Sequence, residues 1–127
     1  MKNILYIEDD VDDQSIFEDA LDILAMGLRY DIVSDGKTAI EKLNSQQQPF
    51  DLILLDLNMP LFNGFDLLRT LKHEESFKKI PVYILSTSAS KKDRKACEEL
   101  GANGFITKPH DFKEYCRKLN EVILTVL

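Results

Sequence analysis

The sequence predicts an α/β fold: a doubly wound, five-stranded parallel sheet with five helices on its two faces. Four short apolar runs lack the polar alternation of half-exposed strands, which is typical of strands buried on both faces. These runs are residues 4–7, 52–55, 82–85 and 105–106. Segments whose apolar residues recur at three and four positions lie between them, as expected for helices with one buried face. Alternation of this kind predicts right-handed βαβ units and therefore a parallel sheet.

The first half of the chain supplies three strands and two helices. Residues 4–7 and 52–55 are continuous apolar runs, whereas residues 28–33 are more polar and predict a weaker strand nearer an edge of the sheet. Two apolar stripes at helical spacing separate these strands. The stripes are Ile16, Phe17, Ala20, Leu21 and Leu24, and then Ala39, Ile40 and Leu43. The polar residues 46–49 form the exit from the second helix and the loop after it.

The second half supplies two more strands, residues 82–85 and 105–106, and three more helical stripes. Gly101 follows the fourth stripe and predicts a helix C-cap, since glycine tolerates the left-handed conformation found there. Both cysteines, Cys97 and Cys116, fall on stripes and are expected to be small core residues. The three stripes are Phe65, Leu68 and Leu71, then Ala96, Cys97 and Leu100, and last Phe112, Tyr115, Cys116, Leu119, Val122, Ile123 and Val126.

Length and charge narrow the classes of function. The 127 residues match the commonest domain size and can bury a core without disulfides or metals. With 16 basic and 22 acidic residues the formal net charge is −6, which argues against binding nucleic acid or an anionic membrane surface. No apolar run approaches the roughly 20 residues that span a bilayer. The two cysteines form no CxxC pair, so reduced thiols and a cytoplasmic location are expected.

Polar and charged residues follow four of the predicted strands at the point where each strand ends. In open α/β sheets, ligands bind outside the carboxyl ends of the strands, so these residues are expected to meet at one rim. They are Glu8, Asp9 and Asp10 after the first strand, Asp56 after the third, Ser86 and Thr87 after the fourth, and Thr107 and Lys108 after the fifth.

Carboxylates that converge at one rim repel one another unless a cation joins them. Mg²⁺ suits such a site, because it takes one or two carboxylates, keeps several waters and completes its shell with phosphate oxygens. An aspartate that faces the metal, such as Asp56, can act as a nucleophile and become an aspartyl phosphate. Lys108 can pair with this aspartate and later with the phosphoryl group, and the Ser86 hydroxyl can hydrogen-bond a phosphoryl oxygen.

Four motifs at the strand ends resemble, in the same order, those of the receiver domain of two-component response regulators. They are Tyr6-Ile7-Glu8-Asp9-Asp10, then Leu54-Leu55-Asp56-Leu57-Asn58-Met59-Pro60 with Gly64 after it, then Leu85-Ser86-Thr87, and last Gly104-Phe105-Ile106-Thr107-Lys108-Pro109. The resemblance covers essentially the whole chain. It implies that residues 1–127 form a single receiver domain with a flavodoxin-like sheet in the strand order 2-1-3-4-5.

The resemblance implies a signalling switch rather than an enzyme. Such a domain accepts a phosphoryl group from a partner histidine kinase or histidine phosphotransfer protein, with Mg²⁺ as cofactor. It assists the transfer itself and loses the group again by hydrolysis. The output is a shifted population of surface conformations that alters the binding of a downstream protein, which the sequence does not identify.

By the same resemblance, each site residue takes the role of the family position that it matches. Asp56 is the phosphoacceptor. The metal is bound by Asp9 directly, by Glu8 through water, by Asp56 and by the backbone carbonyl of Asn58. Glu8 stands where many relatives have aspartate, and this departure keeps the carboxylate.

The resemblance also assigns the parts of a switch. Ser86 is the switch hydroxyl, Lys108 the cation that pairs with the phosphoryl group, and Phe105 the aromatic residue that turns inward when Ser86 moves. The surface of the fourth helix, fifth strand and fifth helix is then the expected docking face. A cis Lys108–Pro109 peptide bond is expected, which would aim the lysine side chain at Asp56.

Several nearby polar residues have simpler interpretations. Asp12 and Asp13 are expected to be first-turn acids on a solvated helix, where the helix dipole favours negative charge. Thr87, Ser88 or Ser90 is expected to cap the fourth helix, because hydroxyls favour the N-cap position.

Three other functions use related features. A phosphatase of the haloacid-dehalogenase class also has an aspartate nucleophile and Mg²⁺, but needs a second aspartate where this chain has Asn58. A flavin-binding module would need a phosphate-binding loop after the first strand, where this chain has three acids. A receiver that is never phosphorylated is not favoured either, because Glu8, Asp9, Asp56, Ser86 and Lys108 are all present.

Overall fold

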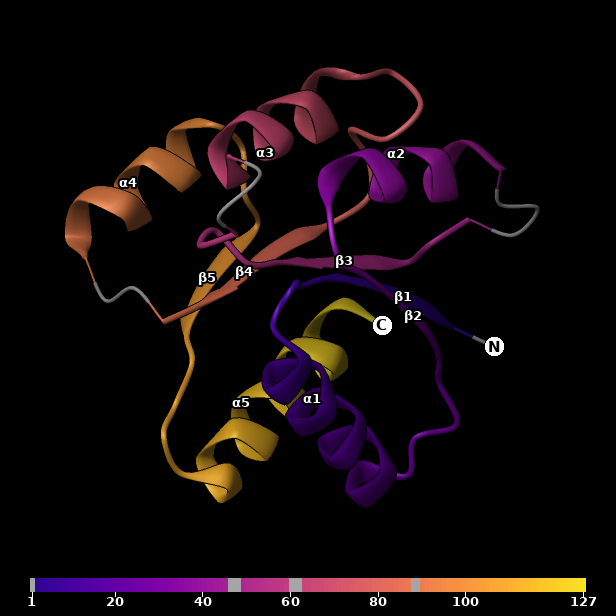
Figure 1. The fold of residues 1–127 in the computed structure, drawn as a ribbon, viewed down its shortest axis with the longest axis vertical. Coiled ribbons are helices and arrows are strands. Elements are labelled where there is room, and N and C mark those ends of the chain that lie inside the picture. Colours follow the sequence, from indigo (N-terminus) through magenta and orange to yellow (C-terminus); the bar gives the residue numbers. More distant parts are fainter. Residues whose placement is uncertain (1, 46–48, 60–62, 88–89) are drawn as a thin grey trace.

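The computed structural model describes residues 2–45, 49–59, 63–87 and 90–127, in which strands and helices alternate (Figure 1). The elements are β1 (Asn3–Ile7), α1 (Val11–Leu24), β2 (Arg29–Val33), α2 (Gly36–Ser45), β3 (Leu52–Leu55), α3 (Gly64–His73), β4 (Val82–Ser86), α4 (Lys91–Glu99), β5 (Gly104–Thr107) and α5 (Phe112–Val126). The sheet has the order β2-β1-β3-β4-β5, and all neighbouring strands are parallel. The predicted fold class and strand order are confirmed.

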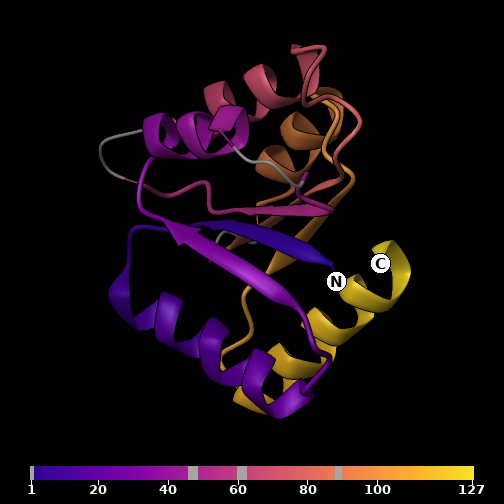
Figure 2. The same ribbon diagram turned by 90° about the vertical axis from the view of Figure 1, so that its right-hand side faces the viewer.

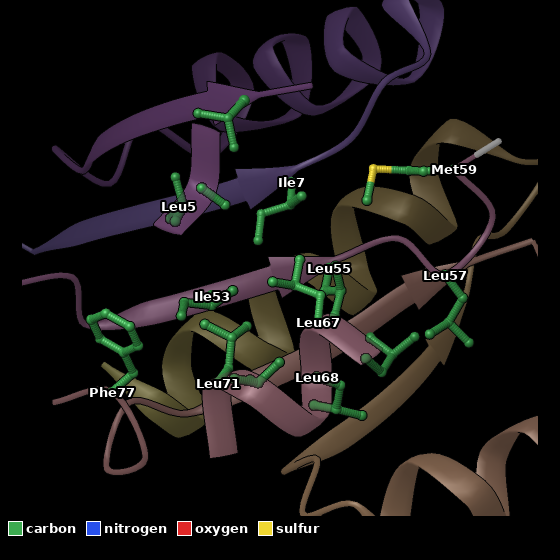
Figure 3. Close-up of a cluster of buried hydrophobic side chains, with 14 of the residues drawn as sticks. Leu5, Ile7, Ile53, Leu55, Leu57, Met59, Leu67, Leu68, Leu71 and Phe77 are labelled. Carbon is green, nitrogen blue, oxygen red and sulfur yellow. The ribbon is translucent and has the colours of Figure 1, made fainter. Parts of the chain in front are cut away.

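The sheet is the middle one of three layers. Helices α2, α3 and α4 cover one face, and α1 and α5 cover the other, as both views show (Figures 1 and 2). Alternate residues of β1 and β3 face opposite layers, so each strand is buried on both sides. Figure 3 shows the core on the α3 side, where Leu5, Ile7, Ile53 and Leu55 meet Leu67, Leu68, Leu71 and Phe77. This double burial explains why the apolar runs show no alternation.

Hydrogen bonds align the carboxyl ends of the strands. Ile7 at the end of β1 pairs with Val33 of β2 and Leu55 of β3. The next residues continue this register, because the Glu8 amide donates to the Val33 carbonyl (2.9 Å) and the Asp56 amide donates to the Ile7 carbonyl (3.1 Å). Strand β2 lies at one edge and is only partly buried, as predicted for residues 28–33.

Helix α4 begins and ends as its sequence suggests. The Ser90 hydroxyl accepts a hydrogen bond of 3.3 Å from the Asp93 amide, so Ser90 is the N-cap among the three candidates. Gly101 has φ of +101°, and its amide donates to Glu98 while the Ala102 amide donates to Cys97. These two bonds form a Schellman motif, which confirms the predicted C-cap. The alternative cap Ser88, Pro60 of the second motif and residues 46–48 of the predicted loop lie outside the described residues.

Some expectations for the core are wrong. Ile16 and Phe112 are each 37% exposed, although both belong to predicted apolar stripes. They line a surface hollow beside α1 and α5, together with Ile23, rather than packing on the sheet. Cys97 is fully buried and Cys116 is half-buried, and both thiols are free.

The expected cis Lys108–Pro109 bond is also wrong, since no peptide bond among the described residues is cis. The trans form is favoured by about 0.5–1 kcal/mol before proline, and here it satisfies the local contacts. The Lys108 amide donates to the Ser86 carbonyl (2.7 Å), and its side chain reaches the acidic rim from this backbone. In the part of the chain that is described, no helix has the length and apolar character needed to cross a bilayer.

Candidate functional site

The carboxyl ends of β1 and β3 bring three carboxylates together. Glu8 and Asp56 are buried and Asp9 is half-buried, and one oxygen of each lies within 4.8 Å of the others. They line a hollow of about 380 Å³, whose lining residues are Glu8, Asp9, Asp10, Asp13, Asp56, Asn58, Thr87 and Lys108. Every predicted metal-binding residue therefore lies at one place, as expected from the meeting of strand ends.

Asp56 is held at the floor of this hollow by backbone contacts. Its amide bonds to the Ile7 carbonyl, and its Oδ1 accepts a hydrogen bond of 3.2 Å from the Asn58 amide. The start of α3 packs against the same segment, because a Cβ on Gly64 would lie 2.7 Å from the Cα of Leu57. A glycine is needed there for the close approach of the two backbones.

The Glu8 carboxylate is the most densely bonded group of the site. Its Oε1 accepts hydrogen bonds from the Tyr6 hydroxyl (3.0 Å) and the Lys108 ammonium (2.5 Å), and its Oε2 accepts one from the Asp10 amide (3.3 Å). Burial raises the pKa of Glu8 to about 7, the neighbouring Asp56 carboxyl adds to the rise, and Lys108 opposes it. The site therefore holds more negative charge than its surroundings readily support.

Burial also raises the pKa of Asp9, and the adjacent Glu8 carboxylate contributes to the rise. Three carboxylate oxygens at this separation are hard ligands, and a divalent cation would stabilise them in their ionised form. The donor set contains no thiolate or imidazole among the described residues that line the hollow. The residues present therefore fit Mg²⁺ better than a softer metal.

The Lys108 ammonium binds two acids of the rim, and neither is Asp56. Besides Glu8, it donates to Asp13 Oδ2 at 2.9 Å, and its side chain is only 7% exposed. Burial alone would lower the pKa of Lys108, but the bonds to Glu8 and Asp13 raise it overall, and Asp56 adds to the rise at longer range. The expected direct pairing of Lys108 with Asp56 is absent from the hydrogen bonds found among the described residues.

Asp13 is a site residue that the sequence interpretation missed. It was expected to be a solvated first-turn acid, but its side chain lies at the hollow and is 30% exposed. Its position in the helix carries the signal, because Asp13 precedes the buried Phe17 by four residues and therefore shares its face. Asp12 lies on the exposed side, as expected.

Asn58 and Thr87 contribute side chains that were not expected to act here. The Asn58 amide nitrogen donates to the Ser86 hydroxyl (3.0 Å) and to the Thr87 hydroxyl (3.1 Å). Ser86 is buried at the end of β4 and Thr87 is exposed at the rim. The loop after β3 is thus tied to the end of β4, beside Asp56.

Two buried tyrosines extend the polar region beneath the rim. Burial raises the pKa of Tyr6 and of Tyr115, so both hydroxyls stay protonated. The Tyr6 hydroxyl donates a hydrogen bond to Glu8, whereas the Tyr115 hydroxyl makes no hydrogen bond to the described residues. Both residues fell on apolar patterns, so their hydroxyls could not be assigned to the site from periodicity alone.

Phe105 lies outside the hollow, on the α4 side of β5. Its ring is half-buried, and the Arg94 guanidinium carbon lies 4.9 Å from the ring centroid. Arg94 also donates to the Phe105 carbonyl at 3.3 Å. The aromatic residue predicted to be part of a switch is therefore covered by a cation from the neighbouring helix.

Comparison with known proteins assigns a family. The model of the response regulator receiver domain matches residues 4–120. Probable transcriptional regulator ycf29 of Pyropia yezoensis is 36% identical over 102 residues, which cover 80% of this chain and 45% of that protein. Two-component response regulator ORR3 of Oryza sativa subsp. indica is 32% identical over 122 residues, covering 96% of this chain and 91% of that protein. The chain spans about half the length of several curated relatives that it matches.

Solved structures show the same fold. The phosphorylated cyanobacterial phytochrome response regulator RcpA superposes with a TM-score of 0.89 at 29% identity, covering 98% of this chain and 93% of that chain. The Mn²⁺-bound form of response regulator Rcp1 superposes with a TM-score of 0.85 at 31% identity, covering 96% of this chain and 91% of that chain.

Proposed function

This chain belongs to the family of response regulator receiver domains, and from that premise we propose that Asp56 accepts a phosphoryl group from a phosphohistidine. The donor is a partner histidine kinase or histidine phosphotransfer protein. The observation that carries the proposal is the position of Asp56, a buried carboxylate within 4.8 Å of the carboxylates of Glu8 and Asp9. The phosphorylated form of the similar regulator RcpA supports it.

The transfer exchanges one bond to phosphorus for another. A carboxylate oxygen of Asp56 forms a bond to phosphorus while the bond between phosphorus and the donor's imidazole nitrogen breaks, and that nitrogen keeps the electron pair. The Asn58 amide holds Oδ1 of Asp56, which leaves the other oxygen to attack. Burial removes water from around this carboxylate, which makes it a better nucleophile than an exposed aspartate.

The residues proposed to hold Mg²⁺ are Glu8, Asp9, Asp56 and the backbone carbonyl of Asn58. When bound, the metal would neutralise charge on the carboxylates and on the phosphoryl oxygens. The Mn²⁺-bound form of the similar regulator Rcp1 supports a divalent ion in such a site. Lys108 and the Ser86 hydroxyl are proposed to bind the remaining phosphoryl oxygens.

The switch resets by hydrolysis rather than by release of a converted substrate. A water oxygen bonds to phosphorus, the bond between phosphorus and Asp56 breaks, and inorganic phosphate leaves. The haloacid-dehalogenase alternative is not favoured, because Asn58 cannot exchange a proton as an acid or base. Its amide instead binds the hydroxyls of Ser86 and Thr87.

The proposed output is a change in the surface formed by α4, β5 and α5. Ser86 would move toward the phosphoryl group, and Phe105 would turn into the space beside β5. The contact between Arg94 and Phe105 supports a coupling of α4 to this aromatic residue. The partner is a downstream protein, and neither nucleic acid nor a membrane is expected as a direct ligand of this acidic chain.

The proposed setting is the cytoplasm, with residues 1–127 acting as one receiver domain. The two free thiols, Cys97 and Cys116, suit a reducing compartment.

A small phosphodonor such as acetyl phosphate tests the proposal directly. Intact-mass measurement in the presence of Mg²⁺ should show one added phosphoryl group on the wild type and none on Asp56→Asn. Asp66→Asn is a matched control, because Asp66 is an exposed acid that pairs with Arg69 on α3. Equal phosphorylation of Asp56→Asn and the wild type would rule the assignment out.

A further inference from the structure

The end of β5 is tied to the first turn of α1 through the Lys108 ammonium. This group donates to Asp13 Oδ2 (2.9 Å) and to Glu8 Oε1 (2.5 Å), which occupies two of its three protons. We propose that Asp13 is a positioning residue that holds Lys108 while Asp56 is unmodified and competes with the phosphoryl group for this ammonium. The inference rests on the proposed function of Asp56 and adds a residue that the resemblance does not assign.

The Asp13 carboxylate can bind Lys108 because the hydrogen bonds at the start of α1 do not occupy it. Asp13 is the third residue of α1, and its amide donates to the N-cap side chain Asp10 (3.0 Å). In a capping box, an acid at this position would return a bond to the N-cap amide. Here the Asp10 amide donates to Glu8 instead, at 3.3 Å. The Asp13 carboxylate is therefore directed across the rim to Lys108, 95 residues away in the chain.

Of the two bonds that the Lys108 ammonium makes, the one to Asp13 is easier to break than the one to Glu8, because Asp13 is less buried. The Glu8 side chain is fully buried, so an unpaired Glu8 carboxylate could not be hydrated. The Asp13 side chain is 30% exposed, so water can replace the ammonium when it leaves. Phosphorylation replaces the singly charged Asp56 carboxylate with a group that carries roughly two negative charges, and this gain in charge favours movement of the Lys108 ammonium away from Asp13.

The ion pair between Asp13 and Lys108 is expected to weaken the binding of a phosphoryl group only modestly. A partly exposed ion pair contributes about 1 kcal/mol or less, which corresponds to roughly a two- to fivefold change in affinity. Loss of the Asp13 charge should therefore strengthen the binding of a phosphoryl mimic by roughly that factor. A residue that only supported the local structure would have the opposite effect on removal, because a loosened site would bind the mimic more weakly.

The test is an NMR titration with beryllofluoride at saturating Mg²⁺, comparing the wild type with Asp13→Asn. The variant is expected to bind beryllofluoride roughly two- to fivefold more tightly than the wild type. Asp12→Asn is the matched control, since it removes the same charge from the same helix turn at an exposed position and should bind as the wild type does. Asp13→Glu retains the charge and should bring the affinity back toward the wild-type value.

Two results would count against the inference in different ways. Unchanged or weaker binding by Asp13→Asn, with normal binding by the wild type, would overturn the role of Asp13 and leave the proposed function standing. Binding of beryllofluoride by Asp56→Asn as tightly as by the wild type would overturn the proposed function and the role of Asp13 together. Thermal unfolding of each variant verifies that the fold is retained.

Discussion

The backbones of Gly64 and Leu57 approach so closely that a Cβ on Gly64 would lie 2.7 Å from the Leu57 Cα. This contact sets the start of α3 against the segment that carries Asp56 and Asn58. The neighbouring atoms belong to the backbone, so they cannot move aside as a flexible side chain could.

Gly64→Ala should therefore destabilise the chain by about 1–3 kcal/mol, the usual cost of forcing extra volume into a packed site. Urea unfolding measures this loss, and amide shifts should concentrate near residues 56–58. Gly27→Ala is the comparison, because no atom lies within 4 Å of a Cβ there and only the positive φ of +66° opposes the change. A stability of Gly64→Ala equal to that of the wild type would show that the two segments separate easily.

The two thiols should differ sharply in reactivity. Cys97 is fully buried, and burial raises its pKa to about 11, so it is protonated and shielded at pH 8. Cys116 is half-buried. A disulfide reagent at pH 8 should modify at most one thiol in the folded wild type and two in denaturant, and Cys116→Ser should remove the folded-state reaction. Rapid reaction of Cys97 in folded Cys116→Ser would contradict the buried position.

The Tyr6 hydroxyl should stabilise the chain through its bond to Glu8. Tyr6→Phe keeps the ring in the core and removes only this donor, so a loss of about 0.5–1.5 kcal/mol is expected in the free energy of unfolding. Tyr30→Phe is a control, because its hydroxyl donates to the exposed Glu18 and should matter less. If both variants unfold at the same denaturant concentration as the wild type, the buried bond contributes nothing measurable.

Arg94 should control the environment of the Phe105 ring. Arg94→Met removes the cation above the ring and the bond to the Phe105 carbonyl, and should shift the ring resonances while costing about 0.5–1 kcal/mol. Lys95→Met, at the exposed neighbouring position, should leave the Phe105 ring resonances and the free energy of unfolding unchanged. Unaltered Phe105 resonances in Arg94→Met would remove the support for coupling α4 to β5.

The sequence predicted the sheet and the meeting of Glu8, Asp9 and Asp56 because both depend on regular rules. Strands buried on both faces appear as continuous apolar runs, and parallel strands bring their carboxyl ends to one rim. The edge position of residues 28–33 followed from polarity in the same way.

Contacts between side chains from different elements were harder to predict. The charge of Asp13 predicts a solvated acid, whereas its place four residues before Phe17 puts it on the buried face of α1. The Asn58 bonds to Ser86 and Thr87 depend on how the loop after β3 lies beside β4, which periodicity does not describe. Helical periodicity does not settle whether a residue at the margin of an apolar stripe is buried. Ile16 belongs to such a stripe, and its side chain is exposed.

We propose that the strand ends build one acidic site where Mg²⁺ and a phosphoryl group on Asp56 bind together. The most direct measurement is peptide-mapped phosphorylation by acetyl phosphate across a Mg²⁺ titration, in the wild type and in Asp9→Asn. We expect modification of Asp56 alone, no modification when Mg²⁺ is chelated, and a higher Mg²⁺ requirement for Asp9→Asn. Phosphorylation at another residue, or phosphorylation of Asp56 that does not respond to Mg²⁺, would contradict it.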